Sequence, residues 1–308
     1  MKSHRKTCLL AASLCALAWL CWATGQEHTT QQTRPLASAQ TKQEHPPLTF
    51  EKIAGPIYQV KGGSGANCGV IIGEKEIVVI DAKMTEQSAK QMLEQIKTLS
   101  PYPIGFVILT HSDGDHVNGL AGFPAGIRLI AHEQTKRDMD EAFKEEGLRA
   151  HLPQVETFSD QKKIRLDNRE IEILYFGPAH TSGDIIVYLP EEKVVFLGDL
   201  YFRGRDPLIH RHKNGNSFGL VKVLKAVLEL RAEIFVSGHS DRATRDDIKA
   251  FVAALEEKQV RIKNLIDEGK SLEEIKGIFN IEDRTAQPGR PRWLSLPEVI
   301  YLELTEKK

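Results

Sequence analysis

One short stretch, residues 110–119, constrains this chain more than any other part of it. It directly follows residues 104–109, an apolar run rich in β-forming residues and short enough to be a buried strand. Four potential metal ligands follow within six residues: His111, Asp113, Asp115 and His116. A polar turn that happens to contain two histidines is the alternative. A strand that ends in imidazoles and carboxylates together predicts a metal site.

Three further apolar runs end in a similar way, with a His or an Asp near a glycine. These runs lie at residues 171–176, 194–197 and 234–236, and they lead to His180, Asp199 and His239, respectively. A lone His at a strand end is usually a polar residue that meets solvent. Four endings of the same design indicate a common centre.

The order of predicted elements favours the α/β class. Predicted strands lie at residues 57–60, 68–72, 77–80, 104–109, 128–131, 171–174, 185–188, 194–197 and 234–236. Predicted helices lie near residues 92–99, 133–144, 218–230 and 244–268, and another follows a capping box at Ser271 and Glu274. Strands are followed by helices in both halves of the chain, which predicts two packed sheets with helices outside both.

The amino-terminal residues predict export. Residues 1–25 combine early basic residues, an apolar run and a small-residue end, which is typical of a signal peptide; an uncleaved anchor is the alternative. Residues 26–47 are rich in Gln, Thr and Pro and predict a flexible linker. Residues 48–308 are expected to form the folded domain. We therefore expect a periplasmic or secreted protein with no other membrane contact.

Charge and cysteine content exclude several classes of protein. The 41 Lys and Arg residues nearly balance the 42 Asp and Glu residues, which argues against a nucleic-acid partner. Three of the 4 cysteines lie before residue 25, so the mature chain keeps only Cys68 and has no internal disulfide. Cys68 has no His nearby in sequence, and we expect it to be a small core residue rather than a nucleophile.

The four strand endings, taken in their order along the chain, resemble the motifs of the metallo-β-lactamase superfamily. The resemblance covers nearly all of residues 50–245. The resemblance implies a four-layer αββα sandwich with two metal ions, usually zinc, along one edge of the paired sheets. It assigns His111 and His180 to the first metal, and Asp115, His116 and His239 to the second. Asp199 would bridge the two metals.

The resemblance also implies a mechanism. A metal-bound hydroxide between the two ions would attack the substrate, because paired divalent ions make a bound water acidic near neutral pH. Asp115 would orient this nucleophile while it binds a metal. Asp115 and Asp199 are therefore the catalytic candidates.

Asp113 is the position that departs from the family, which usually has a second His there. A carboxylate adds a negative charge and a hard oxygen ligand to the first site. The substitution predicts a weakly bound first zinc, with Mn²⁺ or Fe²⁺ as alternative metals, and a less acidic bound water.

These residues predict an exported hydrolase that cleaves an ester, lactone, thioester or amide bond in a small, anionic molecule. An Asp at position 199 resembles the pattern of the lactonases, the glyoxalase II thioesterases and the quinoprotein-associated zinc hydrolases. The β-lactam-degrading members of the family usually have Cys or Ser at this position. Three alternatives stay open: a β-lactamase, an enzyme similar to the single-iron persulfide dioxygenases, and a fold that binds metal without turnover.

Other polar residues receive weaker predictions. A basic loop after Asp199 is expected to attract an anionic substrate through Arg203, Arg205, Arg211 and Lys213. Asp81 and Asp184 are expected to support metal-bound imidazoles. The remaining histidines have no counterpart in the family and are expected to be ordinary polar residues: His132, His151, His210 and His212.

Overall fold

The computed structural model describes residues 45–143, 155–282 and 292–306 of the chain. The predicted signal peptide, nearly all of the predicted linker and His151 lie outside these ranges. Within them, no helix combines the length and the apolar character that crossing a membrane requires.

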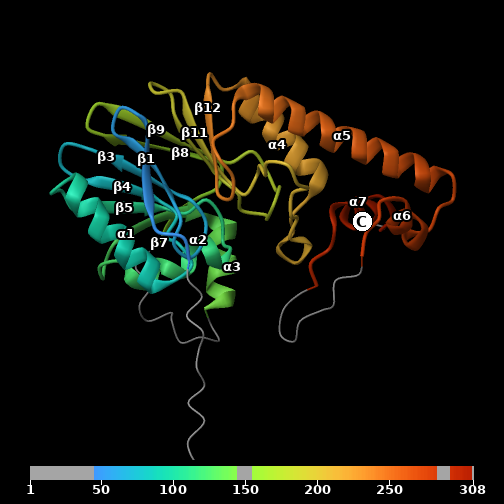
Figure 1. The fold of residues 1–308 in the computed structure, drawn as a ribbon, viewed down its shortest axis with the longest axis horizontal. Coiled ribbons are helices and arrows are strands. Elements are labelled where there is room, and N and C mark those ends of the chain that lie inside the picture. Colours follow the sequence, from blue (N-terminus) through green and yellow to red (C-terminus); the bar gives the residue numbers. More distant parts are fainter. Residues whose placement is uncertain (1–44, 144–154, 283–291, 307–308) are drawn as a thin grey trace, which may run out of the picture. The chain divides into compact units, whose positions relative to one another are not determined.

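A seven-stranded sheet is built from the first half of the domain (Figure 1), and its strand order is β1-β2-β3-β4-β5-β6-β7. The strands are β1 (Thr49–Ala54), β2 (Ile57–Lys61), β3 (Cys68–Ile72), β4 (Ile77–Ile80), β5 (Ile104–Ile108), β6 (Arg128–His132) and β7 (Val155–Phe158). The first four pair as antiparallel hairpins, as their glycine-rich turns predict. Strands β4 to β7 run parallel, which requires crossover connections such as the helix α1 (Glu86–Leu99) between β4 and β5.

A five-stranded sheet is built from the second half, in the order β12-β11-β10-β9-β8. The strands are β8 (Gln161–Leu166), β9 (Arg169–Leu174), β10 (Ile186–Leu189), β11 (Val194–Gly198) and β12 (Ile234–Ser237). Only the pair of β11 and β12 is parallel, and the helix α4 (Ser217–Glu229) connects these two strands.

Three hydrophobic clusters define four layers. Residues such as Ile80, Ile108 and Phe196 pack between the two sheets. Helices α1 and α3 (Glu133–Ala142) cover the outer face of the first sheet with residues such as Met92 and Met139. Helices α4, α5 (Arg245–Asp267) and α7 (Leu296–Thr305) cover the outer face of the second sheet, beside the short α6 (Leu272–Ile278). The predicted αββα sandwich is confirmed.

The strands that the sequence did not predict have weak local signals. Strands β1 and β8 lie at sheet edges and keep many residues exposed, so their apolar content is low. Strand β7 is also an edge strand and is only four residues long. Helix α7 was not predicted either, although Ser295 and Glu298 form a capping box at its start.

Strand direction brings the ligand-bearing loops to one edge. The carboxyl ends of the parallel strands β4 and β5 share an edge of the first sheet, and those of β11 and β12 share an edge of the second. Strand β9 is antiparallel to β10, which is antiparallel to β11, so β9 ends at the same edge as β11. Asp81, His111, His180, Asp199 and His239 all follow strands that end there.

Asn67, in the loop between β2 and β3, joins the two sheets beside this edge. Its backbone N–H donates to the carbonyl oxygen of Gly238 over 2.7 Å. Its side-chain amide donates to the carbonyl oxygens of Ser237 and Ser240, both over 3.1 Å. One residue of the first sheet's loop thus binds the loop after β12, and we call this contact the Asn67 clamp.

Lys83 stabilises the same β2–β3 loop from inside the protein. Its side chain is fully buried, and its ammonium donates to the carbonyl oxygens of Gly62 (2.8 Å) and Ala66 (2.7 Å). Burial lowers the pKa of Lys83. The Ala66 N–H in turn donates to the carbonyl oxygen of Asp115 over 3.1 Å, so the loop is attached to the segment that carries the candidate ligands.

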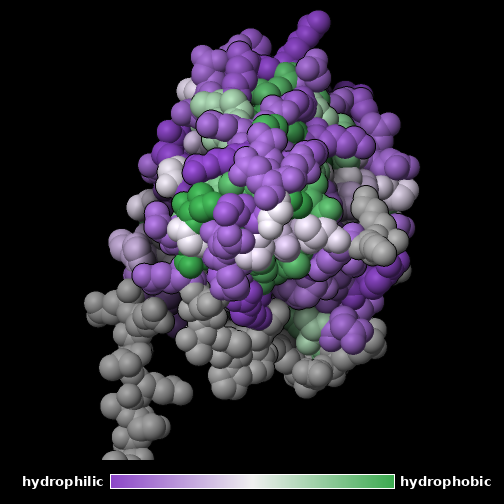
Figure 2. All heavy atoms as spheres, turned by 90° about the vertical axis from the view of Figure 1, so that its right-hand side faces the viewer, coloured by the Kyte–Doolittle hydropathy of each residue, from purple (hydrophilic) through white to green (hydrophobic). Residues whose placement is uncertain are grey.

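Figure 2 shows the face at the end of the domain where α5, α6 and α7 lie in Figure 1. Hydrophilic residues cover most of the coloured surface, and hydrophobic residues appear between them in small groups. Scattered apolar residues are normal on a protein surface.

Candidate metal centre

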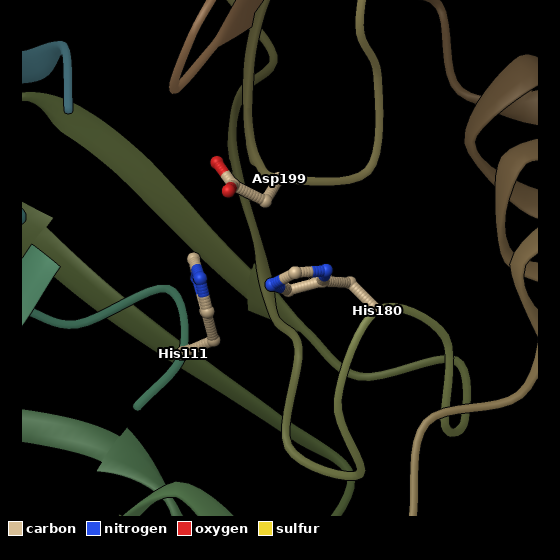
Figure 3. Close-up of side chains that lie close together, drawn as sticks. All are labelled: His111, His180 and Asp199. Atoms are coloured by element: carbon tan, nitrogen blue, oxygen red, sulfur yellow. The ribbon is translucent and has the colours of Figure 1, made fainter. Parts of the chain in front are cut away.

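The first cluster consists of His111, His180 and Asp199, which come from three different loops and point toward one another (Figure 3). Their ligand atoms lie within 4.8 Å of one another. All three residues are buried. The sequence-predicted first-metal residues are therefore brought together at the shared strand edge.

The second cluster consists of Asp115, His116 and His239, whose ligand atoms also lie within 4.8 Å of one another. Asp115 and His116 lie on the short helix α2 (Gly114–Val117), and His239 follows β12. Asp199 faces this cluster as well, because its Oδ1 lies 3.2 Å from His116 Nε2 and its Oδ2 lies 3.2 Å from His239 Nε2. Asp199 thus belongs to the first cluster and also contacts the second.

Asp81 and Thr110 determine which ring nitrogens face the centre. His116 Nδ1 lies 2.8 Å from Asp81 Oδ2, a carboxylate that can only accept. Thr110 Oγ1 donates its hydrogen to Asp81 Oδ2 over 2.8 Å, so it accepts from His111 Nδ1 over 3.0 Å. Both rings therefore carry hydrogen on Nδ1 and turn the lone pair of Nε2 toward the centre. The expected supporting role of Asp81 agrees with these contacts.

The buried lone pairs fit a metal ion. His180 has the same orientation as the other rings, because its Nδ1 donates to the carbonyl oxygen of Leu208 over 2.6 Å. His111 Nε2, His116 Nε2 and Asp199 Oδ1 are buried, and none has a hydrogen-bond partner within the described residues. Buried polar atoms are rarely left unpaired. Imidazole nitrogens and carboxylate oxygens that converge without donors fit a divalent metal ion.

The electrostatics of the two clusters favour positive charge. Burial works to lower the pKa of His180, but its hydrogen bond with Asp113 outweighs burial and raises that pKa to about 9. Burial also works to lower the pKa of His239, but the carboxylates of Asp115 and Asp199 outweigh burial and raise that pKa to about 9. A raised imidazole pKa means that the surrounding carboxylates stabilise a cation, which a proton or a metal ion can supply.

Asp199 is ionised in this environment. Burial works to raise its pKa, but the charge of His116 and the close approach of His116 and His239 outweigh burial, so the pKa of Asp199 lies well below its usual range. Gly238 leaves space for this carboxylate. A Cβ at that position would lie 2.4 Å from Asp199 Oδ1 and 2.8 Å from His116 Cε1, so only glycine fits.

Asp113 contacts two residues that sequence reasoning did not associate with it. Its Oδ2 lies 2.7 Å from His210 Nε2 and 3.0 Å from His180 Nε2, and its Oδ1 accepts from Lys213 Nζ over 2.7 Å. Asp113, His180 and His210 form a further group of ligand atoms within 4.8 Å. Burial works to raise the pKa of Asp113, but the hydrogen bonds with His180 and His210 and the charges of His111 and His180 outweigh burial and lower that pKa. The expectation that His210 is an ordinary polar residue is wrong, because it is buried at the centre.

The other supporting residues act at a greater distance. Asp184 Oδ2 accepts from the Thr181 N–H over 2.7 Å, so Asp184 stabilises the loop beside His180 rather than the imidazole itself. Burial raises the pKa of Asp184 to about 6. His132 packs on the Tyr175 ring (3.8 Å between centroids), and His212 is exposed. For these two histidines, the expectation of ordinary polar residues stays a prediction.

The basic loop is mostly neutralised by the protein's own groups. Arg203 donates to both carboxylate oxygens of Asp247 over 3.2 Å. Arg211 pairs with Glu306 (2.6 Å), and Lys213 points inward to Asp113. Arg205 differs from these three, because its guanidinium lies 4.1 Å above the Phe202 ring centroid. Residues 201–206 line a surface pocket of about 590 Å³ against α5.

Sequence comparisons relate the chain to known proteins. Residues 62–239 match the model of the metallo-beta-lactamase superfamily. The 2,4-dinitroanisole O-demethylase subunit alpha of Nocardioides sp. (strain JS1661) is 26% identical over 208 residues, which cover 67% of this chain and 61% of that protein. A type 2 metallo-beta-lactamase of Elizabethkingia meningoseptica is 26% identical over 164 residues, or 51% of this chain and 63% of that protein. The chain thus spans about three fifths of the length of these two relatives.

Solved structures agree at the level of the fold. A metallo-beta-lactamase from Pontibacter korlensis has a TM-score of 0.56 at 18% identity and covers 68% of this chain and 99% of that chain. A stereoselective inverting sec-alkylsulfatase from Pseudomonas sp. has a TM-score of 0.63 at 18% identity and covers 84% of this chain and 50% of that chain. The family model spans more than half of the chain, so the chain belongs to the metallo-beta-lactamase superfamily.

Proposed function

We propose that this protein is an exported metal-dependent hydrolase that cleaves an ester, lactone, thioester or amide bond in a small molecule. The observation that carries the proposal is the pair of His and Asp clusters that share Asp199. Divalent ions held by such a pair supply an acidified water and a Lewis acid for the bond under attack.

The residues of the chain divide this work. His111 and His180 would hold one ion, and His116 and His239 the other, with their Nε2 atoms. Asp199 would be a ligand of both ions, since it belongs to the first cluster and faces His116 and His239 of the second. Asp115 is the candidate that orients the attacking water, because its side chain is 26% exposed and reaches both His239 and solvent.

The names of the relatives do not identify the bond that this protein cleaves. Their names refer to O-demethylation, to β-lactams and to alkyl sulfates, and they are distant from this chain. β-Lactam hydrolysis is the second candidate, because two further sequence relatives, at 26% and 24% identity, are also named metallo-beta-lactamases. The carboxylates Asp113, Asp115 and Asp199 also suit iron or manganese, so a single-iron enzyme is a further alternative.

The test begins with protein purified without added metal. Elemental analysis is followed by turnover of ester, lactone, thioester and β-lactam substrates, before and after removal of metal by chelation and its return. We expect bound divalent metal and activity that chelation abolishes and zinc restores. Activity that survives complete chelation contradicts the proposal. A single tightly bound iron with no hydrolysis would favour the iron alternative instead.

Export is part of the proposal, and the residue pattern of positions 1–25 supports it. Fractionation of expressing bacterial cells, with amino-terminal sequencing of the exported protein, tests it. We expect the protein outside the cytoplasm and cleaved near residue 25. Retention of the intact chain in the cytoplasm contradicts export but leaves the proposed hydrolase activity untouched.

A further inference from the structure

Lys213 points into the protein rather than into solvent. It lies on the loop between β11 and α4, and its ammonium donates to Asp113 Oδ1 (2.7 Å), Ser112 Oγ (3.1 Å) and the Ser112 carbonyl oxygen (3.2 Å). Its side chain is 22% exposed. An ammonium has three hydrogens, and these contacts use all of them. Lys213 is therefore committed to the Ser112–Asp113 segment and is not available to a substrate.

The other oxygen of Asp113 faces the first cluster. Its Oδ2 accepts from His210 Nε2 over 2.7 Å. The same oxygen lies 3.0 Å from His180 Nε2 and 3.8 Å from His111 Nε2. Other partners hold the Nδ1 atoms of both rings, so each Nε2 offers a lone pair once a metal ion displaces any proton on it. Separations of roughly 3–4 Å are expected between ligands that each lie about 2.1 Å from one ion. The carboxylate is thus oriented from outside by Lys213 and His210, with Oδ2 toward the position of the first ion.

We propose that Asp113 and Lys213 together replace the neutral imidazole that the family usually has at position 113. Asp113 is a ligand of the first ion, and Lys213 and His210 are its positioning residues. The pair is a charge-compensated unit, because the ammonium offsets the carboxylate. The inference rests on the proposed metal-dependent function. It revises the expectation from sequence, which counted the extra negative charge of Asp113 without a neighbouring cation.

The pair predicts that a single change at either position unbalances the first site. In the Asp113→His variant, the Lys213 ammonium keeps its position but loses its counter-charge beside a divalent ion. Two such charges a few ångströms apart interact by more than the roughly 1.4 kcal/mol that corresponds to a tenfold change in affinity. Asp113→His should therefore bind the first zinc at least about tenfold more weakly than the parent. The double variant Asp113→His, Lys213→Met should return to within about threefold of the parent.

The experiment is a calorimetric zinc titration of the full chain after chelation, for the parent, Asp113→His and the double variant. The second zinc site is an internal reference, because its ligands are unchanged. Asp113→Asn, alone and with Lys213→Met, provides a second pair of nearly isosteric variants in case the His variant does not fold. Lys225→Met is the matched control in the Asp113→His background, because Lys225 pairs with Glu256 (2.5 Å) on the outer helices. Lys225→Met should not restore the affinity for the first zinc.

The outcomes separate this inference from the proposed function. Rescue of the first site by Lys213→Met, but not by Lys225→Met, supports the charge-compensated pair. If Asp113→His binds the first zinc as tightly as the double variant does, the pair is wrong while the metal-dependent function stands. If the parent binds neither zinc nor another divalent ion, both are wrong. Circular dichroism of each variant excludes unfolding as the cause of a loss.

Discussion

The two clusters of the metal centre differ in how they are supported. Two of the three residues of the second cluster are neighbours in sequence, and Asp81 orients its His116 from an adjoining strand end. The first cluster depends on Lys213 and His210, which lie on a loop of the other sheet. The second is also more open, since the side chain of His239 is 30% exposed and that of His180 is 0% exposed. A short motif can thus supply two of the three residues of one cluster, whereas the residues of the other cluster come from separate loops.

The largest expected effect comes from removal of a ligand of the second cluster. His116→Ala should abolish binding of the second ion and lower kcat/KM by more than the roughly 100-fold that loss of an outer-shell partner costs. The first ion should stay bound, because its ligands are unchanged. Elemental analysis, turnover and circular dichroism of the variant provide the measurement. Loss of both ions from a folded variant would show that the two clusters do not form independently.

The number of protons released when a metal ion binds should also differ between the two clusters, and this is the second-largest expected effect. The protein's own carboxylates raise the pKa of His239 to about 9 and that of His116 well above its usual value, whereas the first cluster has one raised ring, His180, also at about 9. The pKa of His111 is lowered well below its usual value, chiefly by burial, so that ring is already neutral. Because a bound metal must displace these protons, affinity should fall as pH falls below 9.

The expected slopes differ between the sites. One displaced proton corresponds to about tenfold in affinity per pH unit and two to about 100-fold. Below pH 9, we therefore expect the second ion to lose affinity about tenfold faster per pH unit than the first. Zinc titrations at several pH values, in buffers of different ionisation enthalpy, give the protons released at each site. Equal release would contradict the difference between the clusters.

The supporting carboxylates allow a matched comparison. Asp81→Asn disturbs the ring of His116 and should lower the affinity for the second ion by roughly 10–100-fold. Asp184→Asn disturbs the loop beside His180 through Thr181 and should act mainly on the first ion, by a smaller factor because it does not touch the ring. Zinc affinities of both variants test this. If Asp81→Asn lowers the affinity for the first ion more than that for the second, the assignment of Asp81 to the second cluster is wrong.

The smallest expected effect concerns the mouth of the second cluster. Phe202 stacks on His239 with 5.9 Å between ring centroids, and Arg205 lies above the same Phe202 ring. We expect Arg205→Gln to raise KM for anionic substrates about threefold, a modest loss typical of an exposed charge. Arg203→Gln is the matched control and should leave KM unchanged, because Arg203 already pairs with Asp247. Equal KM values for both variants and the parent would contradict substrate attraction by this loop.

Sequence reasoning located the residues of both clusters but not the surroundings of the first. The ligand positions could be predicted because each follows an apolar strand, and parallel pairing brings strand ends to one edge. The contacts of Asp113 could not be predicted, since His210 and Lys213 lie 97 and 100 residues away and belong to no local motif. The edge strands β1 and β8 were missed for a different reason, because their exposed polar residues weaken the apolar alternation.

The Asn67 clamp has a consequence for the order of folding. It joins residues 170 and 173 positions apart, and closing so long a loop costs entropy before any contact compensates for it. The hairpins of each sheet are local and can form first. The edge that holds the candidate ligands should therefore be completed only when the two halves dock. Zinc uptake during refolding would then report this final step, later than the rise of secondary structure.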